Sequence, residues 1–321
     1  MTEGRSCPLH YRYRPEQLTM APQACDADVL YVIGGLYGNP FALDEIEAMA
    51  EREQQGGLRV KLIFNGDFNW FNADDALFRD VNDRVLSHDA ITGNVEYELA
   101  RPGDGAGCGC AYPDFVEDAV VERSNRIMER LQRVAGNHPD LQERLAGLPR
   151  YRCLIFGGLK VVILHGDPES LAGWGLAHEA LTQAGDGQLA EWFRQTDADV
   201  IVSTHTCLPV IRHLTVGGRV RLFLNNGAAG MGNLLGDPRG LIARLALTSP
   251  APEGLGPEYP LPLHGALVPV DFPLADWIVR FDHLWPPGSD AALSYRHRIL
   301  KGTSLTVKQL LGLTGTGERL I

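Results

Sequence analysis

Cysteine and long apolar runs are both scarce in this chain. Six cysteines in 321 residues are too few for a disulfide scaffold, and a reducing compartment leaves them as thiols. No apolar run approaches the roughly 20 residues of a membrane span, and residues 1–27 carry scattered charges without the apolar region of a signal peptide. We therefore expect a cytoplasmic protein that does not associate with membranes.

Positive charge is also in short supply. The chain has 29 Lys and Arg against 40 Asp and Glu, a formal net charge of -11. Such a field repels phosphate backbones, so nucleic-acid binding is not expected, whereas small anionic substrates remain compatible. No feature of the sequence points to a particular oligomeric state.

The composition predicts a folded chain, with 45% hydrophobic and 21% charged residues and no low-complexity tract. No internal repeat or central linker is visible, which favours one domain. We assign it to residues 28–285, after a polar N-terminal tail of residues 1–27. Residues 286–321 are rich in turns and are predicted to form a peripheral tail with one short helix near residues 305–311.

Short apolar runs alternate with glycine-flanked polar residues, which predicts an α/β fold. One helix is expected after Asn39-Pro40, an N-cap followed by proline at the first helical position. A longer one is expected from the capping box of Asp114 and Glu117 to Gly136. Strands are predicted at residues 28–35, 59–64, 89–92, 151–156, 160–164, 199–203, 219–224, 241–247 and 266–270, with hairpins around Gly157-Gly158 and Gly217-Gly218.

Four polar residues follow predicted strands, namely Asp67, Asn94, His165 and His205. In open α/β sheets, the loops at the carboxyl ends of strands are where ligands bind. Taken singly, each residue has an ordinary explanation as a turn residue or a hydrogen-bonded core histidine. Their combination in this order calls for a common explanation.

Their order and their placement at strand ends resemble the pattern D-x-H, G-D-x-x-D, G-N-H-[DE], H, G-H-x-H of the calcineurin-like metallophosphoesterases. The resemblance covers residues 29–230. It includes residues 34–39, which are similar to the family's G-D-x-H-G-N. It also includes Asn225-Asn226-Gly227, which is similar to the asparagine-glycine sequence that follows a late strand in the family. The resemblance implies a four-layer α/β/β/α sandwich of two mixed sheets, with the metals at one edge.

The resemblance also implies a ligand set. Asp67 occupies the position of the carboxylate that bridges two metals, and Asn94 that of the amide ligand of the second metal. His165 and His205 complete the second site. Oxygen and nitrogen donors of this kind suit Mn, Fe or Zn and leave positions open for water and a phosphoryl oxygen.

The first metal site departs from the family pattern. Gly35 and Tyr37 replace the aspartate and histidine of D-x-H, Trp70 replaces the second aspartate of G-D-x-x-D, and Cys207 replaces the last histidine. One metal rather than two is therefore expected. Tyr37 and Cys207 either fill space or hold a metal of different character, such as ferric iron.

The histidine that protonates the leaving group in the family is also missing, because Val95 follows Asn94. Tyr37 and Glu96 are the candidate catalytic residues, and His88 is a further candidate donor. A rival amide, Asn137 in Gly136-Asn137-His138, follows a predicted helix, where Gly-Asn is an ordinary stop. We therefore favour Asn94.

The leading hypothesis is a metal-dependent hydrolase in which activated water attacks a small, anionic, phosphorylated substrate. The first alternative is a catalytically silent relative that binds a ligand or a protein in the same cleft. The second is a metalloenzyme with other chemistry, in which Tyr37 and Cys207 create a redox-capable site. Cys108 and Cys110 are interpreted as ordinary loop thiols, with a redox or metal pair as the alternative.

Overall fold

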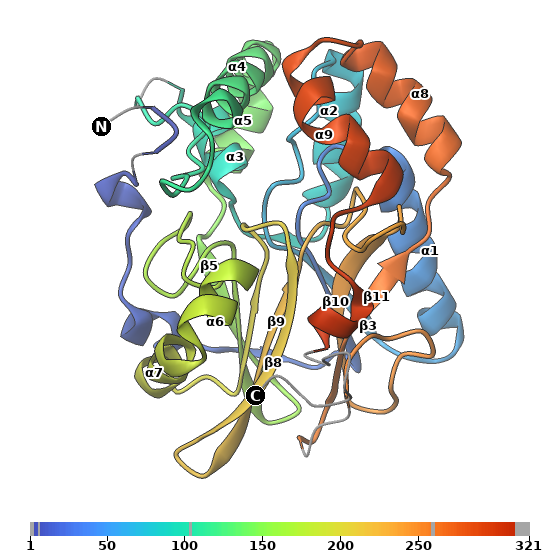
Figure 1. Cartoon of the computed structure of the whole chain (residues 1–321). Coiled ribbons are helices and arrows are strands. Elements are labelled where there is room, and N and C mark those ends of the chain that lie inside the picture. The colour runs from blue at the N-terminus through green and yellow to red at the C-terminus, as the bar shows by residue number, and fades with distance from the viewer. Residues whose placement is uncertain (1–2, 6, 103–104, 258–260, 312–321) are drawn as a thin grey trace.

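The computed structural model describes the chain except for residues 1–2, 6, 103–104, 258–260 and 312–321 (Figure 1). Two mixed β-sheets form its centre. The first sheet has the order β11 (His264–Val270), β10 (Gly240–Ala246), β2 (Val29–Ile33), β3 (Val60–Phe64), β4 (Asp89–Ala90). The second has the order β1 (Gln23–Cys25), β5 (Tyr151–Phe156), β6 (Leu159–Leu164), β7 (Val200–Ser203), β9 (Arg219–Asn226), β8 (Pro209–Val216).

The strands that precede the polar residues run in parallel within each sheet. β2, β3 and β4 are parallel neighbours, with β10 antiparallel to β2. In the second sheet β6, β7 and β9 are parallel neighbours, flanked by antiparallel β5 and β8. Because parallel strands end at the same edge of a sheet, the loops after β3, β4, β6 and β7 can meet there.

The core lies in three layers, one between the sheets and one on the outer face of each sheet. Successive side chains of a strand point to opposite faces, so each sheet contributes to two of these layers. Leu30 and Val32 of β2 pack with Ile163 of β6 in the layer between the sheets. Tyr31 of β2 faces the opposite side, and Val162 of β6 faces the outer side of the second sheet. The sheets therefore pack face to face, with helices outside, as predicted.

The helices cover the outer faces and one end of the sheets (Figure 1). Residues of most of them join the apolar cluster beside the first sheet. The helices are α1 (Pro40–Gln55), α2 (Asp75–Val85), α3 (Asn94–Ala100), α4 (Asp118–Ala135), α5 (Pro139–Ala146), α6 (His178–Ala184), α7 (Gly187–Thr196), α8 (Leu274–Leu284), α9 (Asp290–Lys301) and α10 (Val307–Leu310). Leu189 and Phe193 of α7 pack on the second sheet.

Two expectations about the ends of the chain are wrong. Residues 290–301, predicted as turns, form α9, whose Ala291 and Ile299 are buried in the cluster beside the first sheet. Residues 1–27, predicted as a polar tail, contain two 3₁₀ turns with buried Tyr11 and Leu18 and the strand β1, which pairs with β5. The domain boundaries themselves stay a prediction.

The longest helix also begins later than predicted. α4 starts at Asp118, and neither Asp114 nor Glu117 caps it through a side chain. Residues 113–116 instead form a turn in which Val116 N donates to Pro113 O at 3.0 Å. Arg5 donates to the carbonyl oxygens of Pro113 and Val116 at 2.8 and 2.6 Å. This distant contact stabilises the turn where the capping box was expected.

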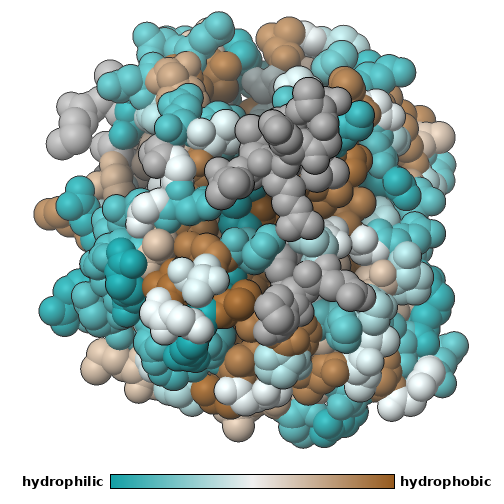
Figure 2. Space-filling view, turned by 60° about the horizontal axis from the view of Figure 1, so that its bottom comes forward, coloured by the Kyte–Doolittle hydropathy of each residue, from teal (hydrophilic) through white to brown (hydrophobic). Residues whose placement is uncertain are grey.

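The surface gives no sign of a membrane span. Within the described ranges, no helix has both the length and the apolar composition needed to cross a bilayer. On the face in Figure 2, hydrophobic residues appear in separate small areas among hydrophilic ones.

The predicted cap of α1 is confirmed, and it links the helix to the site edge. Asn39 Oδ1 accepts hydrogen bonds from Phe41 N and Ala42 N at 3.1 Å, while Asn39 Nδ2 donates to Gly230 O at 3.0 Å. Asn39 is fully buried. Substituting Asn39→Ala should lower the free energy of unfolding by about 2 kcal/mol, because the cap is lost and a buried carbonyl is left unpaired.

Urea unfolding followed by circular dichroism measures this loss. The matched control is Thr306→Ala, which removes the exposed cap of the four-residue helix α10. A loss at Asn39 no larger than that at Thr306 would contradict the assigned role.

Candidate metal centre

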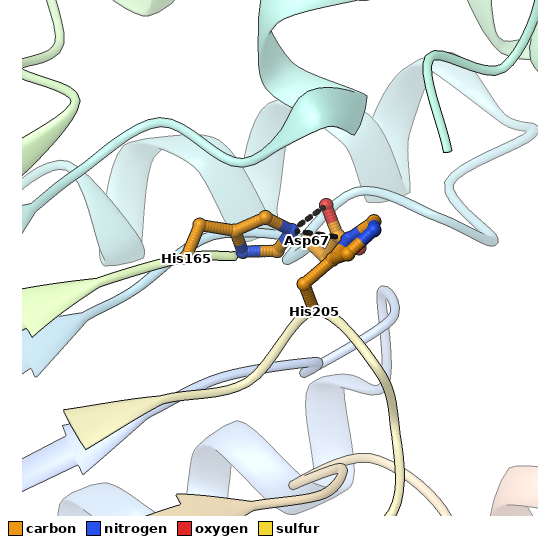
Figure 3. A group of neighbouring side chains, drawn as sticks. All are labelled: Asp67, His165 and His205. Carbon is orange, nitrogen blue, oxygen red and sulfur yellow. Dashed lines mark hydrogen bonds and ion pairs between the residues drawn. The ribbon is translucent and has the colours of Figure 1, made fainter. Parts of the chain in front are cut away.

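Three of the predicted ligands converge at the edge where the two sheets meet. Asp67 follows β3, His165 follows β6 and His205 follows β7 (Figure 3). Ligand atoms of the three side chains all lie within 4.8 Å of one another, and all three residues are buried. Each sheet therefore contributes to one compact cluster.

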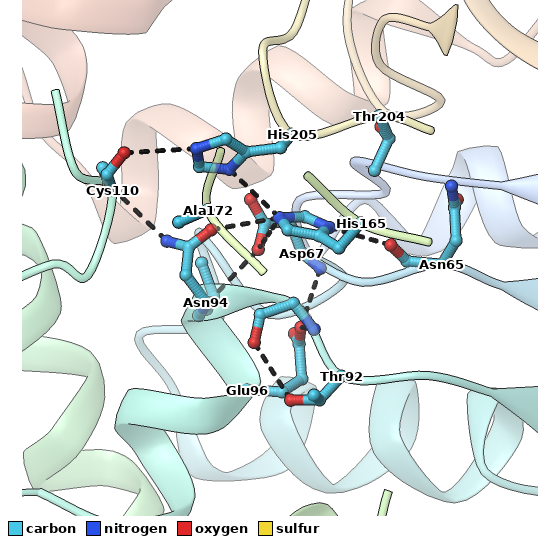
Figure 4. Close-up of polar contacts among 12 residues, drawn as sticks. Asn65, Asp67, Thr92, Asn94, Glu96, Cys110, His165, Ala172, Thr204 and His205 are labelled. Carbon is cyan, nitrogen blue, oxygen red and sulfur yellow. Dashed lines mark hydrogen bonds and ion pairs between the residues drawn. The ribbon is translucent and has the colours of Figure 1, made fainter. Parts of the chain in front are cut away.

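The two imidazoles are oriented by backbone carbonyl groups. His165 Nδ1 lies 2.8 Å from Asn65 O, and His205 Nε2 lies 3.1 Å from Cys110 O (Figure 4). A carbonyl only accepts, so these nitrogens carry the hydrogens. The remaining nitrogens, His165 Nε2 and His205 Nδ1, face each other at 3.2 Å. Metal-binding histidines are oriented by the same kind of contact.

Asn94 completes the cluster from the first residue of α3, not from the strand end that the sequence predicted. Its Nδ2 donates to Cys108 O at 3.0 Å, which turns Oδ1 toward His165 Nε2 at the same distance. Asp67 Oδ1 lies 3.3 Å from that nitrogen. Four acceptor atoms thus point at one another, an arrangement that a shared metal ion or a proton on His165 Nε2 would satisfy.

This donor set fits a divalent metal. It combines one carboxylate oxygen, one amide oxygen and two imidazole nitrogens, which suits Mn, Fe or Zn. Without a metal, a proton on His165 is the available substitute, because it lets Nε2 donate to its neighbours.

The pKa shifts in the metal-free cluster agree with a proton on His165 in place of the metal. Burial raises the pKa of Asp67, but His165 outweighs burial and holds this pKa below its usual range. Burial lowers the pKa of His165, yet the Asp67 carboxylate leaves it raised. Burial and the charge of His165 lower the pKa of His205 to about 3, so His205 stays neutral.

Glu96 lies beneath the cluster and holds its loops in place. Its Oε2 accepts from Asp67 N at 2.7 Å and Gly93 N at 3.1 Å, while Oε1 accepts from Phe68 N at 3.0 Å and Asn69 N at 3.2 Å. The carboxylate thereby joins the loop after β3 to the start of α3. Burial and the Asp67 charge raise the pKa of Glu96 to about 7.

The backbone of the site is held in an unusual conformation. Among the described residues, five non-glycine residues have positive φ, and three of them belong to this edge: Tyr37 at 52°, Asp67 at 55° and Cys207 at 62°. Such residues cost roughly 1–3 kcal/mol each and persist where the surroundings enforce them. Three of the five described residues of this kind therefore lie at one edge, where the surrounding contacts enforce them.

Comparison with solved structures identifies the fold that carries this cluster. The chain matches a metallophosphoesterase from Sphaerobacter thermophilus with a TM-score of 0.53 and 16% identity, over 87% of this chain and 100% of that one. The chain has the metallophosphoesterase fold. A hypothetical protein from Pyrococcus horikoshii matches with a TM-score of 0.58 and 12% identity, over 86% and 99% of the two chains. No family model and no curated protein matches the sequence.

The altered side of the metallophosphoesterase pattern is filled by side chains that contact each other. Tyr37 Oη lies 2.7 Å from Cys207 Sγ. A Cβ at Gly35 would lie 3.0 Å from the Tyr37 ring, so this ring takes the space beside the glycine. The structure does not bring Cys207 into the cluster of Asp67, His165 and His205. Its role as a ligand stays a prediction.

Two other candidates lie away from the cluster. His88 packs its ring 6.0 Å from that of Phe64, with Glu47 and Arg84 among its charged neighbours. His138, from the rival Gly-Asn-His motif, contacts Asp75 at 2.9 Å and Arg79 at 3.0 Å. The geometry favours Asn94 over the rival amide.

Three contacts of the site were not expected from the sequence. Cys110 contributes its carbonyl oxygen, which accepts from both His205 and Trp174 Nε1, the latter at 2.9 Å. The Trp174 ring lies 5.5 Å from that of His205. Arg298 of α9 donates to Cys207 O at 2.6 Å. The only sequence signal was the glycine-rich composition of the loop around Cys108 and Cys110.

We expect Glu96→Gln to damage both stability and metal affinity. An amide nitrogen in place of one carboxylate oxygen would face backbone N–H donors, so the free energy of unfolding should fall by about 2 kcal/mol. Metal affinity should fall about tenfold or more, because the loops of Asp67 and Asn94 lose their common anchor. Denaturant titration and calorimetry with Mn²⁺ measure the two effects.

Glu47→Gln is the matched control, since Glu47 pairs with Arg84 at a partly exposed site. It should change stability by less than about 1 kcal/mol and leave metal affinity intact. An unaltered metal affinity in Glu96→Gln would rule out the anchoring role.

The stability of the metal-free protein should depend on pH through His165. Because its folded pKa is raised by Asp67, the pair contributes fully below the unfolded pKa of about 6.5 and loses its contribution as pH rises through the folded pKa. Unfolding free energy in chelator should therefore fall above pH 6.5. Metal affinity should change in the opposite direction, since protons compete for the same nitrogen.

Urea titrations from pH 6.5 to 8.5 with chelator, for wild type and His165→Asn, test this. The variant should lose the part of the slope that His165 contributes, while Glu96, with its pKa of about 7, still contributes near the lower end of the interval. If the unfolding free energy of the wild type rose over this pH interval, the raised pKa of His165 would be contradicted.

Proposed function

We propose that the protein is a metal-dependent hydrolase of phosphate esters that works with one metal ion. The observation that carries the proposal is the convergence of Asp67 Oδ1, Asn94 Oδ1, His165 Nε2 and His205 Nδ1, with both histidines oriented by backbone carbonyls. The fold shared with a metallophosphoesterase supports it. The proposed substrate is a small, anionic, phosphorylated molecule.

A divalent metal at this point supplies Lewis acidity toward a phosphoryl oxygen and acidifies water. The chain's own residues prepare the site for it. Asp67 stays ionised at neutral pH because its pKa is lowered, and His205 stays neutral. Burial of all four ligands keeps bulk water away, which strengthens the electrostatic interactions there.

The contacts of Tyr37 and Cys207 support one metal rather than two. Their side chains are paired with each other, and Gly35 offers no donor. Burial, Cys207 and Asp67 raise the pKa of Tyr37 well above its ordinary value, so its proton is held at neutral pH. Of the two candidate catalytic residues we propose Tyr37 as the proton donor, because the oxygens of Glu96 are occupied by backbone N–H groups. Glu96 acts through the backbone of Asp67 as a positioning residue.

One observation favours a second function, a binding protein in which the metal is structural. The cluster is covered by the Cys110 carbonyl and by Trp174, and structural metal sites are closed whereas catalytic ones keep an open position. In that case the metal would hold the covering loop, and a ligand or partner protein would bind above it.

Metal analysis by mass spectrometry tests the single-metal site. Protein loaded with Mn²⁺, Fe²⁺ or Zn²⁺ and freed of excess should retain about one metal per chain. His165→Ala and His205→Ala should lose most of it, whereas His138→Ala should retain it, because His138 belongs to the rival motif. Two tightly held metals per chain would contradict the proposal.

Activity assays separate the two functions. The loaded protein should hydrolyse a generic phosphomonoester or phosphodiester, with rates reduced at least about a hundredfold by His205→Ala or chelator and unchanged by His138→Ala. Activity that ignores chelator and both ligand substitutions would overturn the hydrolase. Retained metal without turnover of either ester would favour the binding protein.

A further inference from the structure

A second charged site lies away from the metal cluster, where the N-terminal segment crosses β5. A cavity of about 440 Å³ opens between residues 12–23 and residues 149–153. In Figure 1 the N-terminal segment runs down the side of the molecule that carries β5 and α7. A volume of this size is typical of sites for small molecules.

The charge of this cavity is opposite to that of the chain. Arg12, Arg150 and Arg152 line it, and among the described residues no carboxylate lines it. The chain as a whole has 40 acidic and 29 basic residues. Arg12 and Arg150 therefore form a positive site on an acidic protein, beside Arg152, which is paired with Asp89, and a concave wall concentrates that field.

The arginines of this site have donors to spare. Among the described residues, neither Arg12 nor Arg150 forms a side-chain hydrogen bond or an ion pair. Arg152 contacts Gln23 and Asp89 through its terminal nitrogens, both at 3.1 Å, while its buried Nε has no partner. Guanidinium groups with free N–H donors are well suited to oxyanions.

A second cavity of similar size lacks this property. It measures about 400 Å³ and is lined by three arginines together with four carboxylates. Arg244 and Glu53 pair there at 2.8 Å, so its charges are already compensated. The two cavities are therefore alike in volume and in number of arginines. They differ in that carboxylates line the second cavity, whereas none of the described lining residues of the first is a carboxylate.

We propose that the arginine-lined cavity binds a small molecule carrying at least two negative charges on phosphate or carboxylate groups. The guanidinium groups of Arg12, Arg150 and Arg152 contact the oxyanions, and Gln17 supplies a polar group beside them. The site is separate from the metal cluster and does not depend on the proposed hydrolase activity.

Tyr13 links the wall of the cavity to the loop that follows His165. Its ring lines the cavity, and its hydroxyl donates to Asp167 O at 2.9 Å, in the loop that follows His165. None of the four residues of the metal cluster is among the described residues that line the cavity. Substitutions in one site can therefore be compared with substitutions in the other.

Isothermal titration calorimetry on the full metal-free chain at low salt tests the proposal with three probes: pyrophosphate, citrate and inorganic phosphate. Pyrophosphate or citrate should bind at about one per chain and more tightly than phosphate. Arg12→Gln and Arg150→Gln should each weaken binding about tenfold or more, because each removes a charge-assisted contact. Added salt should weaken binding further.

Two controls separate this site from its rivals. Arg52→Gln lies in the compensated cavity, and His205→Ala lies in the metal cluster; both should leave pyrophosphate and citrate binding unchanged. Thermal unfolding without ligand should be nearly the same in Arg12→Gln, Arg150→Gln and wild type, since neither arginine has a partner to lose.

The outcomes decide the matter. Tighter binding of pyrophosphate than of citrate supports a phosphorylated ligand, and the reverse order supports a polycarboxylate. Absence of saturable binding for all three probes overturns the proposal, as does unweakened binding in the Arg12→Gln, Arg150→Gln double variant. Loss of binding in His205→Ala also overturns it, because the anion would then occupy the metal cluster.

Discussion

The buried carboxylate of Glu96 is the contact on which the geometry of the site depends. Its two oxygens receive backbone N–H groups from the loop after β3 and from the start of α3, so it fixes Asp67 and Asn94 relative to each other. Asp67 has a positive φ, a conformation that must be enforced from outside. One buried carboxyl group therefore accepts hydrogen bonds from two loops and helps to enforce the backbone conformation of Asp67.

The parts of the site that follow local rules could be predicted from the sequence. Asp67, His165 and His205 stand just after apolar runs, and such runs become buried strands whose exits meet at one edge. The sequence predicted Asn94 at the end of a strand, and the structure has it as the first residue of α3. Its position at this edge is the same in both cases, because α3 begins shortly after β4 ends.

Contacts between distant segments could not be predicted in the same way. The Cys110 carbonyl meets His205 across 95 residues of chain, and a backbone oxygen has no sequence signature. The helix α9 was missed because its buried side, with Ala291 and Ile299, is weakly apolar and visible only through packing on α4 and α8. The capping box at Asp114 failed because Arg5, far away in sequence, stabilises a turn there.

The division of ligands between the sheets has a consequence for folding. Asp67 and Asn94 come from the first sheet, and His165 and His205 from the second, so neither sheet holds a complete site. The four donors assemble only after the sheets have packed together. A metal bound there would act as a cross-link that closes late in folding and has to be released before the sheets separate, which would slow unfolding more than it would speed folding.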